Sequence, residues 1–190
     1  NIFYLRRMDM KKFPKWLIAL IIVVVCIFAI FSAYKNTYNS FVTLDETVSA
    51  EWAEVQNQYQ RRYDLIPNLV STVKGYASHE SEVLTQVSEA RASAGGQINI
   101  SEDVLNNPEA FAKYQQIQDN LGASLQRLLM VTEQYPDLKA DQNFLALQDQ
   151  LEGTENRIAV ARKRFNDAVK EYNIWGFRDM PELIEAGGEH

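Results

Sequence analysis

The sequence predicts an all-α protein, in which an N-terminal transmembrane helix is followed by an antiparallel (up-and-down) four-helix bundle. Three observations predict this class. One uncharged apolar stretch near the N-terminus is long enough to span a membrane. Apolar residues after it recur every three or four positions, as they do along one face of a helix. No segment shows the strict alternation that is typical of a half-buried strand.

The apolar stretch covers residues 16–34, "WLIALIIVVVCIFAIFSAY", and contains no charged residue, glycine or proline. As a helix it would extend about 28 Å, close to the hydrocarbon thickness of about 30 Å. Signal-peptide and lipoprotein cleavage are disfavoured because Phe31 and Val25 stand where small residues are needed. A soluble core helix would not be apolar on every face. We therefore expect a retained anchor that contacts the lipid bilayer through residues 16–34.

The flanks of this stretch predict its orientation. Residues 1–15 form a basic N-terminus, in which five basic residues are opposed by one Asp. The positive-inside rule places this segment in the cytoplasm and the rest of the chain outside. We expect a single-pass protein of the bacterial cytoplasmic (inner) membrane, with its bundle on the periplasmic or extracytoplasmic side.

The charge of the exterior part excludes some classes of partner. Residues 1–35 hold six of the 19 basic and one of the 25 acidic residues, which leaves 13 basic and 24 acidic residues and a net charge of −11 outside. We expect no nucleic-acid binding through the overall field of such a domain. The single cysteine, Cys26, lies in the predicted span, so no disulfide forms within the chain. Two histidines leave little material for a transition-metal site, and we expect no metal, cofactor or catalytic group.

Four apolar runs predict the helices of the bundle, over residues 36–173, and leave residues 174–190 as a C-terminal tail. Asn107 and Pro108 suit the N-cap and first turn of the third helix, and Asp141 suits the N-cap of the fourth. Charges of both signs alternate around the apolar stripe of the fourth helix, which is typical of a solvated face or of coiled-coil packing with a partner. The runs comprise Phe41 to Ile66, Leu69 to Ala90, Phe111 to Val131 and Phe144 to Tyr172.

The stretch "RRYDLIPNLVSTVKGYASHE" (residues 61–80) lies where the first two runs meet. Breaking the helix near Asp64–Pro67 would give four helices of similar length, with Asp64 as N-cap and Pro67 in the first turn. We therefore predict a helix–helix corner there that includes Asn68. A kinked helix that continues through Pro67 is the alternative.

Candidate interaction residues lie at this corner and at the connector between the third and fourth helices. Arg61 and Arg62 either complement the dipole at a helix end or form a basic spot for an anionic partner group. His79 and Glu80 do not form a metalloprotease motif, because a second His four residues later is absent; His79 is expected to hydrogen-bond within the second helix or, if exposed, to sense pH. The connector contributes Tyr135, Pro136 and Asp137.

Six asparagines on or beside the helical runs suggest a buried polar network that fixes helix register, because Asn is a mediocre helix former. On this hypothesis Asn156→Leu would spoil a unique fold. The six are Asn36, Asn39, Asn143, Asn156, Asn166 and Asn173.

Two long blocks resemble the LemA family of bacterial membrane proteins: "YNSFVTLDETVSAEWAEVQNQYQRRYDLIPNLVSTVKGYASHESEVLTQVSEARA" and "LMVTEQYPDLKADQNFLALQDQLEGTENRIAVARKRFNDAVKEYN". The resemblance covers roughly residues 36–173. It implies an N-terminal anchor or lipidated start, a helical bundle outside the cytoplasm and no established catalytic activity. Some members of the family occur beside membrane metalloproteases or other membrane proteins, which makes membrane proteases candidate partners. Members of the family usually carry a longer stretch between "YN" and "GF", whereas this sequence has only two residues there, in "YNIWGF". The short spacing is either a natural deletion or the result of missing residues.

The function expected from these features is that of a non-enzymatic scaffold or adaptor for envelope proteins, acting as a homo-oligomer. Tethering to a membrane raises the effective concentration of neighbours, so individually weak helix-face contacts suffice. The alternative is a structural role, in which the protein assembles into a ring or lattice that organises the membrane.

Overall fold

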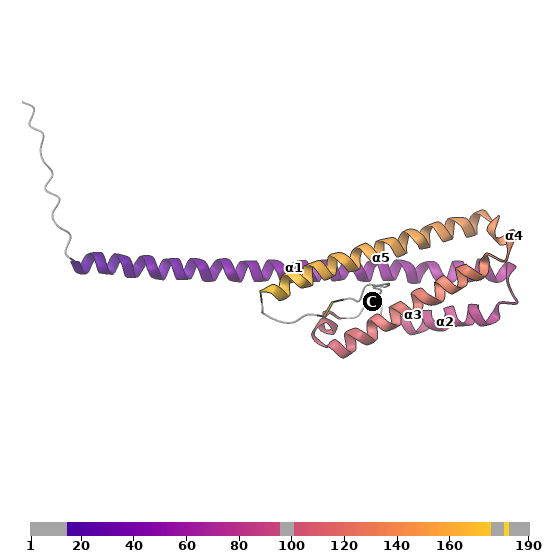
Figure 1. The fold of residues 1–190 in the computed structure, drawn as a ribbon, viewed down its shortest axis with the longest axis horizontal. Coiled ribbons are helices and arrows are strands. Elements are labelled where there is room, and N and C mark those ends of the chain that lie inside the picture. The colour runs from indigo at the N-terminus through magenta and orange to yellow at the C-terminus, as the bar shows by residue number, and fades with distance from the viewer. Residues whose placement is uncertain (1–14, 96–100, 176–180, 183–190) are drawn as a thin grey trace, which may run out of the picture. The chain divides into compact units, whose positions relative to one another are not determined.

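The computed structural model describes residues 15–95, 101–175 and 181–182. Over these residues it contains helices and no strand, so the predicted all-α class is confirmed (Figure 1). The chain divides into two compact units, Asn1–Val42 and Thr43–His190. The elements in order are α1 (Lys15–Tyr76), α2 (Ser81–Gly95), the 3₁₀-helix η1 (Glu102–Asn106), α3 (Pro108–Thr132), α4 (Pro136–Lys139) and α5 (Gln142–Ile174).

In the first unit, α1 exposes its large apolar side chains on all faces. Phe28 is 72% exposed and Ile30 is 70% exposed, and Trp16 and Tyr34, at the two ends of the apolar stretch, are also exposed. Among the described residues, α1 is the one helix that is long and apolar enough to cross a membrane. Such exposure is expected of a segment whose side chains face lipid, which is as apolar as they are. The basic residues 1–14 that predict its orientation lie outside the described residues.

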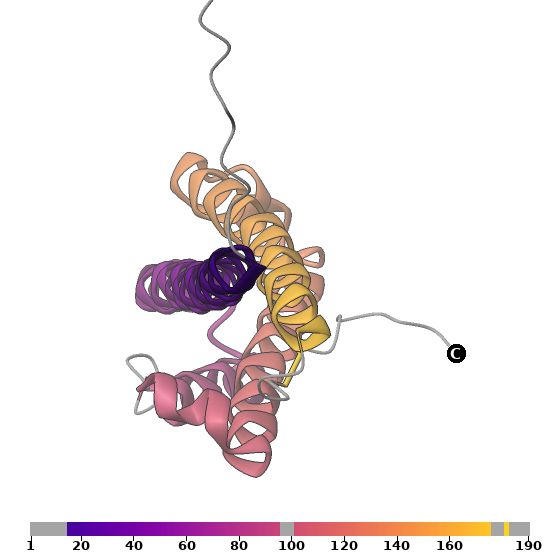
Figure 2. The same ribbon diagram turned by 90° about the vertical axis from the view of Figure 1, so that its left-hand side faces the viewer.

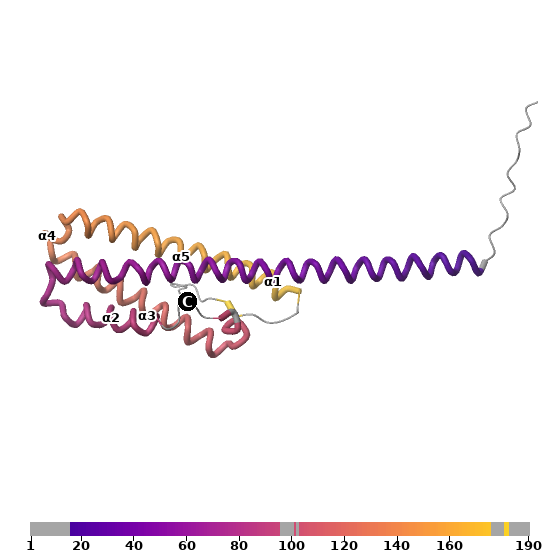
Figure 3. The backbone as a smooth tube through the Cα atoms, turned by 180° about the vertical axis from the view of Figure 1, so that it is seen from behind, coloured from indigo at the N-terminus to yellow at the C-terminus, as the bar shows by residue number. Residues whose placement is uncertain are grey.

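In the second unit, four helices run up and down beside one another. The bundle portion of α1, then α2, α3 and α5 follow the chain in alternating directions, as the tube in Figure 3 traces. In the end-on view of Figure 2, α5 lies above the pair formed by α2 and α3. Of the described helices, α2 and α3 bring their backbones together most extensively. The predicted bundle of several packed helices is thus confirmed.

The predicted corner near Asp64–Pro67 is wrong. α1 continues through Pro67 and ends at Tyr76, and the chain reverses over Ala77–Glu80. The four helices are not of similar length, because the second apolar run is divided: its residues up to Tyr76 extend α1, and the rest form the short α2 of 15 residues. From Thr43 to Tyr76, α1 then matches the 33 residues of α5.

A contact from α2 explains how the helix tolerates Pro67. Proline has no N–H, so the carbonyl of Tyr63, four residues earlier, loses its helical hydrogen bond. Arg91 of α2 donates from Nε to that carbonyl at 3.3 Å, and its guanidinium lies 3.8 Å from the centre of the Tyr63 ring. Gly95 lies so close that a Cβ there would approach the Tyr63 hydroxyl to 2.7 Å. The hydrogen bond that Pro67 cannot donate to the Tyr63 carbonyl is therefore replaced by one from Arg91 on the neighbouring helix.

Two of the three predicted N-caps, Asn107 and Asp141, are confirmed, whereas Asp64 lies inside α1. The Asn107 side chain accepts from the N–H groups of Glu109 and Ala110, with Pro108 in the first turn of α3. The Asp141 side chain accepts from the N–H of Phe144 at 2.7 Å and begins α5. Both caps satisfy backbone donors that a helix start leaves without partners.

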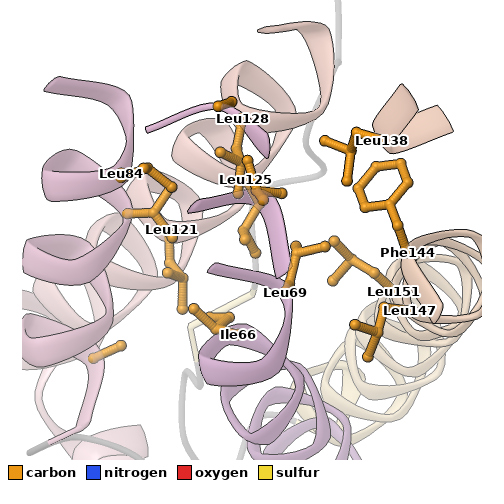
Figure 4. Packing of buried hydrophobic residues seen from close by; sticks show 14 residues of the cluster. Ile66, Leu69, Leu84, Leu121, Leu125, Leu128, Leu138, Phe144, Leu147 and Leu151 are labelled. Carbon is orange, nitrogen blue, oxygen red and sulfur yellow. The ribbon is translucent and has the colours of Figure 1, made fainter. Parts of the chain in front are cut away.

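The core of the bundle has two parts of different chemistry. The aliphatic half consists mainly of Leu, Val and Ala side chains from α1, α2, α3, α4 and α5, which Figure 4 shows pointing toward one another. The aromatic half comes from α1, α3 and α5, and includes buried polar residues. We define the aliphatic half as Ile66, Leu69, Val73, Ala77, Leu84, Val87, Ala94, Leu121, Leu125, Leu128, Leu138, Phe144, Leu147 and Leu151. We define the aromatic half as Trp52, Tyr59, Arg62, Phe111, Tyr114, Gln118, Arg162 and Phe165.

Candidate functional site

A groove between α1, α3 and α5 gathers most of the buried charge of the bundle. We call it the arginine groove; its volume is about 500 Å³. Its lining residues are Arg62, Gln118, Asp119, Gly122, Ala123, Gln126, Glu155, Ile158, Ala159, Arg162 and Lys163.

Arg62 is the central side chain of this groove and is 3% exposed. Its Nη2 donates to the backbone carbonyl of Gln118 at 3.0 Å and to Oε1 of the same residue at 2.8 Å. Its Nη1 lies 3.3 and 3.4 Å from the two carboxylate oxygens of Glu155 on α5. The guanidinium also lies 5.0 Å from the centre of the Tyr59 ring, within the range of a cation–π interaction. These contacts on three sides hold the guanidinium in one orientation.

Gly122 of α3 lies beside the Arg62 guanidinium. A Cβ at this position would lie 3.4 Å from Nη1 of Arg62, at the edge of ordinary van der Waals contact. The guanidinium therefore packs against this part of α3, but its position does not require a glycine there.

A second buried arginine, Arg162, also lines the groove. Arg162 of α5 is 7% exposed, and its Nη1 donates to Oδ1 of Asp119 on α3 at 2.9 Å. The two arginines thus link α3 to two other helices, α1 through Arg62 and α5 through Arg162. Each arginine is matched with a carboxylate that remains partly in contact with solvent, since the side chains of Glu155 and Asp119 are 40% and 42% exposed.

A cluster of buried aromatic rings lies next to Arg62, in contact through Tyr59. The Trp52 ring centre lies 5.8, 5.4 and 5.3 Å from those of Phe111, Tyr114 and Phe165. These separations are typical of favourable aromatic pairs. The hydroxyls of Tyr59 and Tyr114 are buried without a hydrogen-bond partner. Burial raises the pKa of both phenols above the ordinary value, although for Tyr59 the positive charges of Arg162 and Arg62 act in the opposite direction.

The predicted interaction residues of α1 fall into different environments. Arg61 is exposed, whereas the neighbouring Arg62 is buried, so the two do not form one basic spot. Asp64 lies inside α1 and accepts from Gln60 Nε2 at 2.7 Å instead of capping a helix. Pro67 and Asn68 are both exposed on the same helix. The dipole interpretation of Arg61 and Arg62 is also wrong, because α1 ends at Tyr76.

Two tyrosines join the chain reversal after α1 to the connector between α3 and α5. Tyr135 donates to Oε1 of Glu80 at 2.8 Å, and Tyr76 donates to Oδ2 of Asp141 at 3.0 Å. Each hydrogen bond to a carboxylate raises the pKa of its phenol. The backbone N–H of Phe144, followed by the Tyr76 hydroxyl, lowers the pKa of Asp141. Both hydrogen bonds tie the two connecting segments together at this end of the bundle.

The other candidate residues of these segments are exposed. His79 lies in the turn between α1 and α2, not within α2 as expected, and its side chain is exposed. Pro136 occupies the first turn of α4, followed by the exposed Asp137. Over the described residues there is no group of three or more His, Cys, Asp or Glu side chains that could hold a metal ion.

Sequence reasoning missed the buried polar residues. The asparagine network is not borne out where it can be examined most directly, because Asn143 and Asn156 are exposed. The buried polar residues are Arg62, Gln115, Gln118, Thr132, Thr154 and Arg162. Arg62 and Arg162 each lie three or four positions from buried residues on both sides, so they occupy positions of the apolar stripe of their helix. An arginine at such a position was the feature of the sequence that could have indicated its burial.

Comparisons with known proteins agree with the helical fold. The chain is similar to the magnetosome proteins MamQ 1 and MamQ 2 of Paramagnetospirillum magneticum, each 28% identical over 170 residues, or 82% of this chain and 62% of the relative. Magnetosome protein MamQ of Magnetospirillum gryphiswaldense is 27% identical over the same shares. The chain therefore spans about three fifths of the length of these relatives. The LemA family model matches residues 51–188, which include all the residues of the arginine groove, and the chain belongs to the LemA family.

Proposed function

We propose that this chain is a non-enzymatic, membrane-anchored scaffold or adaptor for proteins of the cell envelope, acting as a homo-oligomer. One observation carries the proposal: α1 contains both the exposed apolar stretch and the first core helix of the bundle. Anchoring the bundle at a membrane raises its effective concentration toward neighbouring membrane proteins. The names of the relatives assign them to magnetosomes, which supports a membrane-associated role.

The proposed topology is a cytoplasmic N-terminus, a single span over residues 16–34 and a bundle on the extracytoplasmic side of the inner membrane. Since Cys26 is the only cysteine, Cys26→Ser gives a background without thiols. Asp149→Cys, at an exposed position of α5, should then react in intact cells with a maleimide that does not cross membranes. Asp9→Cys, on the predicted cytoplasmic side, is the matched control. Labelling of Asp9→Cys but not Asp149→Cys would contradict the orientation.

The proposed partners are envelope proteins, including membrane proteases, and further copies of this chain. Helix α5 carries the exposed apolar side chains of Leu145 and Val160, which are 43% and 51% exposed. A photo-crosslinking residue at position 160 tests whether this surface contacts proteins in native membranes. The proposal expects defined adducts with an envelope protein or a second copy, and few adducts from the exposed position of Gln116 on α3. Absence of any protein adduct from both positions would contradict a scaffold role.

A structural role, assembly into a ring or lattice, is favoured by the mixed charges on α5. Arg157, Arg164 and Asp167 are exposed on this helix, and Val160 lies among them. Surfaces with charges of both signs beside an apolar residue suit repeated side-by-side contacts. A very large particle in detergent would favour the lattice, and a small closed oligomer would favour the scaffold.

A further inference from the structure

We propose that the arginine groove binds a small organic acid, whose carboxylate takes the place of Glu155 on the guanidinium of Arg62. This inference goes beyond the scaffold role and does not depend on it. It rests on the contacts of Arg62, on the exposure of Glu155 and on the dimensions of the groove.

Arg62 is already arranged as a receptor for a carboxylate. Nη2 is held by two acceptors of Gln118 at 3.0 and 2.8 Å, and the Tyr59 ring faces the guanidinium at 5.0 Å. Little side-chain entropy is therefore left to lose when Nη1 donates to a bound carboxylate, and pre-organisation of this kind favours binding. Arginine is also the side chain whose planar fork best matches a carboxylate.

Glu155 occupies the position that an incoming carboxylate would take. Its oxygens lie 3.3 and 3.4 Å from Nη1, longer than the 2.7–2.9 Å that charge-assisted hydrogen bonds usually reach. The Glu155 side chain is 40% exposed, so its own carboxylate can be hydrated when it turns away, while the carboxylate of the acid pairs with the buried Arg62. Exchange of one carboxylate for another conserves the charge on Arg62.

Gln118 supplies a second reason to expect an acceptor in the groove. Its Oε1 accepts from Arg62, and its Nε2 is buried with no hydrogen-bond partner. Gln118 is 2% exposed, and a buried donor without a partner costs free energy. A small rotation of this amide toward a bound acid would provide the missing acceptor.

The local charge favours an anion despite the acidic character of the chain. Arg62, Arg162 and Lys163 line the groove, against the two carboxylates of Asp119 and Glu155. Charges beyond about 8 Å are largely screened at physiological ionic strength, so these neighbours dominate the potential in the groove. When Glu155 turns away, the excess of positive charge in the groove increases.

The size and remaining walls of the groove restrict the ligand to a small molecule. A volume of about 500 Å³ lies within the range of small-ligand pockets, which is about 300–1,000 Å³. Ile158, Ala123 and Ala159 form apolar walls beside the charged groups. A short carbon chain with one or two carboxylates fits both the charge and the apolar walls.

Isothermal titration calorimetry of the detergent-solubilised full chain tests the inference. The ligands are acetate, butyrate, glutarate and citrate, with sodium chloride added to hold the ionic strength constant. We expect saturable binding of at least one of them, with a Kd of about 1 mM or tighter. Absence of saturable binding by all four to both the unchanged chain and Glu155→Gln overturns the proposal.

Matched variants locate the binding. Ala159→Leu fills the groove from an exposed position of α5 and should abolish binding, whereas Ala146→Leu, exposed on α5 but outside the groove, should retain it. Glu155→Gln removes the competing carboxylate and should tighten binding about two- to fivefold, since partly exposed ion pairs are weak. Glu171→Gln, also exposed on α5, should leave the Kd unchanged.

Thermal unfolding followed by circular dichroism confirms that each variant is folded before its titration. Binding that survives Ala159→Leu, or that weakens in Glu155→Gln, contradicts the proposed position of the carboxylate. Neither result bears on the scaffold role, because oligomeric mass and membrane crosslinks are measured without the acid. Failure of one proposal is therefore distinguishable from failure of the other.

Discussion

The two halves of the bundle core use different side chains for similar packing. The aliphatic half consists mainly of Leu, Val and Ala side chains and contains no buried arginine among its members. The aromatic half combines large rings with Arg62, Gln118 and Arg162, and the arginine groove opens beside it. Burial of a charge costs free energy unless the charge is paired, so burying the two arginines makes the aromatic half less favourable to fold than the aliphatic half. The comparison suggests that the aliphatic half stabilises the fold, whereas the aromatic half also maintains a site.

Removal of the central ring of the aromatic half should have the largest effect. Trp52 is fully buried and contacts three other rings, so Trp52→Ala should reduce the free energy of unfolding by about 3–5 kcal/mol. Urea unfolding followed by circular dichroism measures the loss. Trp175→Ala, at the half-exposed residue after α5, is the control and should change stability by less than about 0.5 kcal/mol. Similar losses from both variants would contradict the description of the aromatic half.

Substituting the adjacent residues Arg61 and Arg62 compares the contribution of an exposed arginine to stability with that of a buried one. Arg62→Ala should cost about 1–3 kcal/mol, because it leaves the Gln118 acceptors without their donor. The cost stays below that of a fully buried ion pair, since Glu155 can be hydrated again. Arg61→Ala, one position earlier and exposed, should lie within about 0.5 kcal/mol of the unchanged chain. Equal effects in urea unfolding would show that burial of Arg62 carries no special role.

Because Arg91 of α2 replaces the hydrogen bond that Pro67 of α1 lacks, we expect substitutions at these two positions to be coupled. Arg91→Met removes the donor to the Tyr63 carbonyl and should cost about 1 kcal/mol. In a Pro67→Ala background the same change should cost less, because Ala at position 67 supplies its own N–H to that carbonyl. A double-mutant cycle measures the coupling. Strict additivity would contradict the account of how α1 continues through Pro67.

The carboxylate of Asp141, the N-cap of α5, should make a smaller contribution to the free energy of unfolding than the side chains above, and acid titration should reveal it. The pKa of Asp141 is lowered in the folded protein, so its carboxylate contributes stability above the unfolded pKa of about 4, and this contribution is lost as the pH falls through the folded value. Asp141→Asn keeps an N-cap but cannot titrate. Below about pH 4, the unfolding free energy of this variant should fall less steeply than that of the unchanged chain. Identical slopes would contradict the role of the Phe144 and Tyr76 hydrogen bonds.

Much of the helical architecture follows from the sequence, because apolar spacing and cap residues act locally. Asn107, Pro108 and Asp141 lie where their chemistry predicts. The corner at Pro67 could not be judged locally, since its compensation comes from Arg91, on the next helix. Burial of Arg62 and Arg162 likewise depends on carboxylates of other helices, Glu155 and Asp119. The alternating charges of the fourth helix predict a solvated face or a coiled-coil contact, whereas Arg162 of this helix is buried between Ile158 and Phe165.

The proposed oligomeric scaffold is tested most directly by the mass of the full chain in detergent. Light scattering with correction for bound detergent gives the mass of the protein part, for comparison with 21.8 kDa for one chain. For a homo-oligomer we expect a discrete multiple of this mass that persists on dilution. A particle containing one chain of 21.8 kDa would contradict self-association and, with it, the homo-oligomeric scaffold.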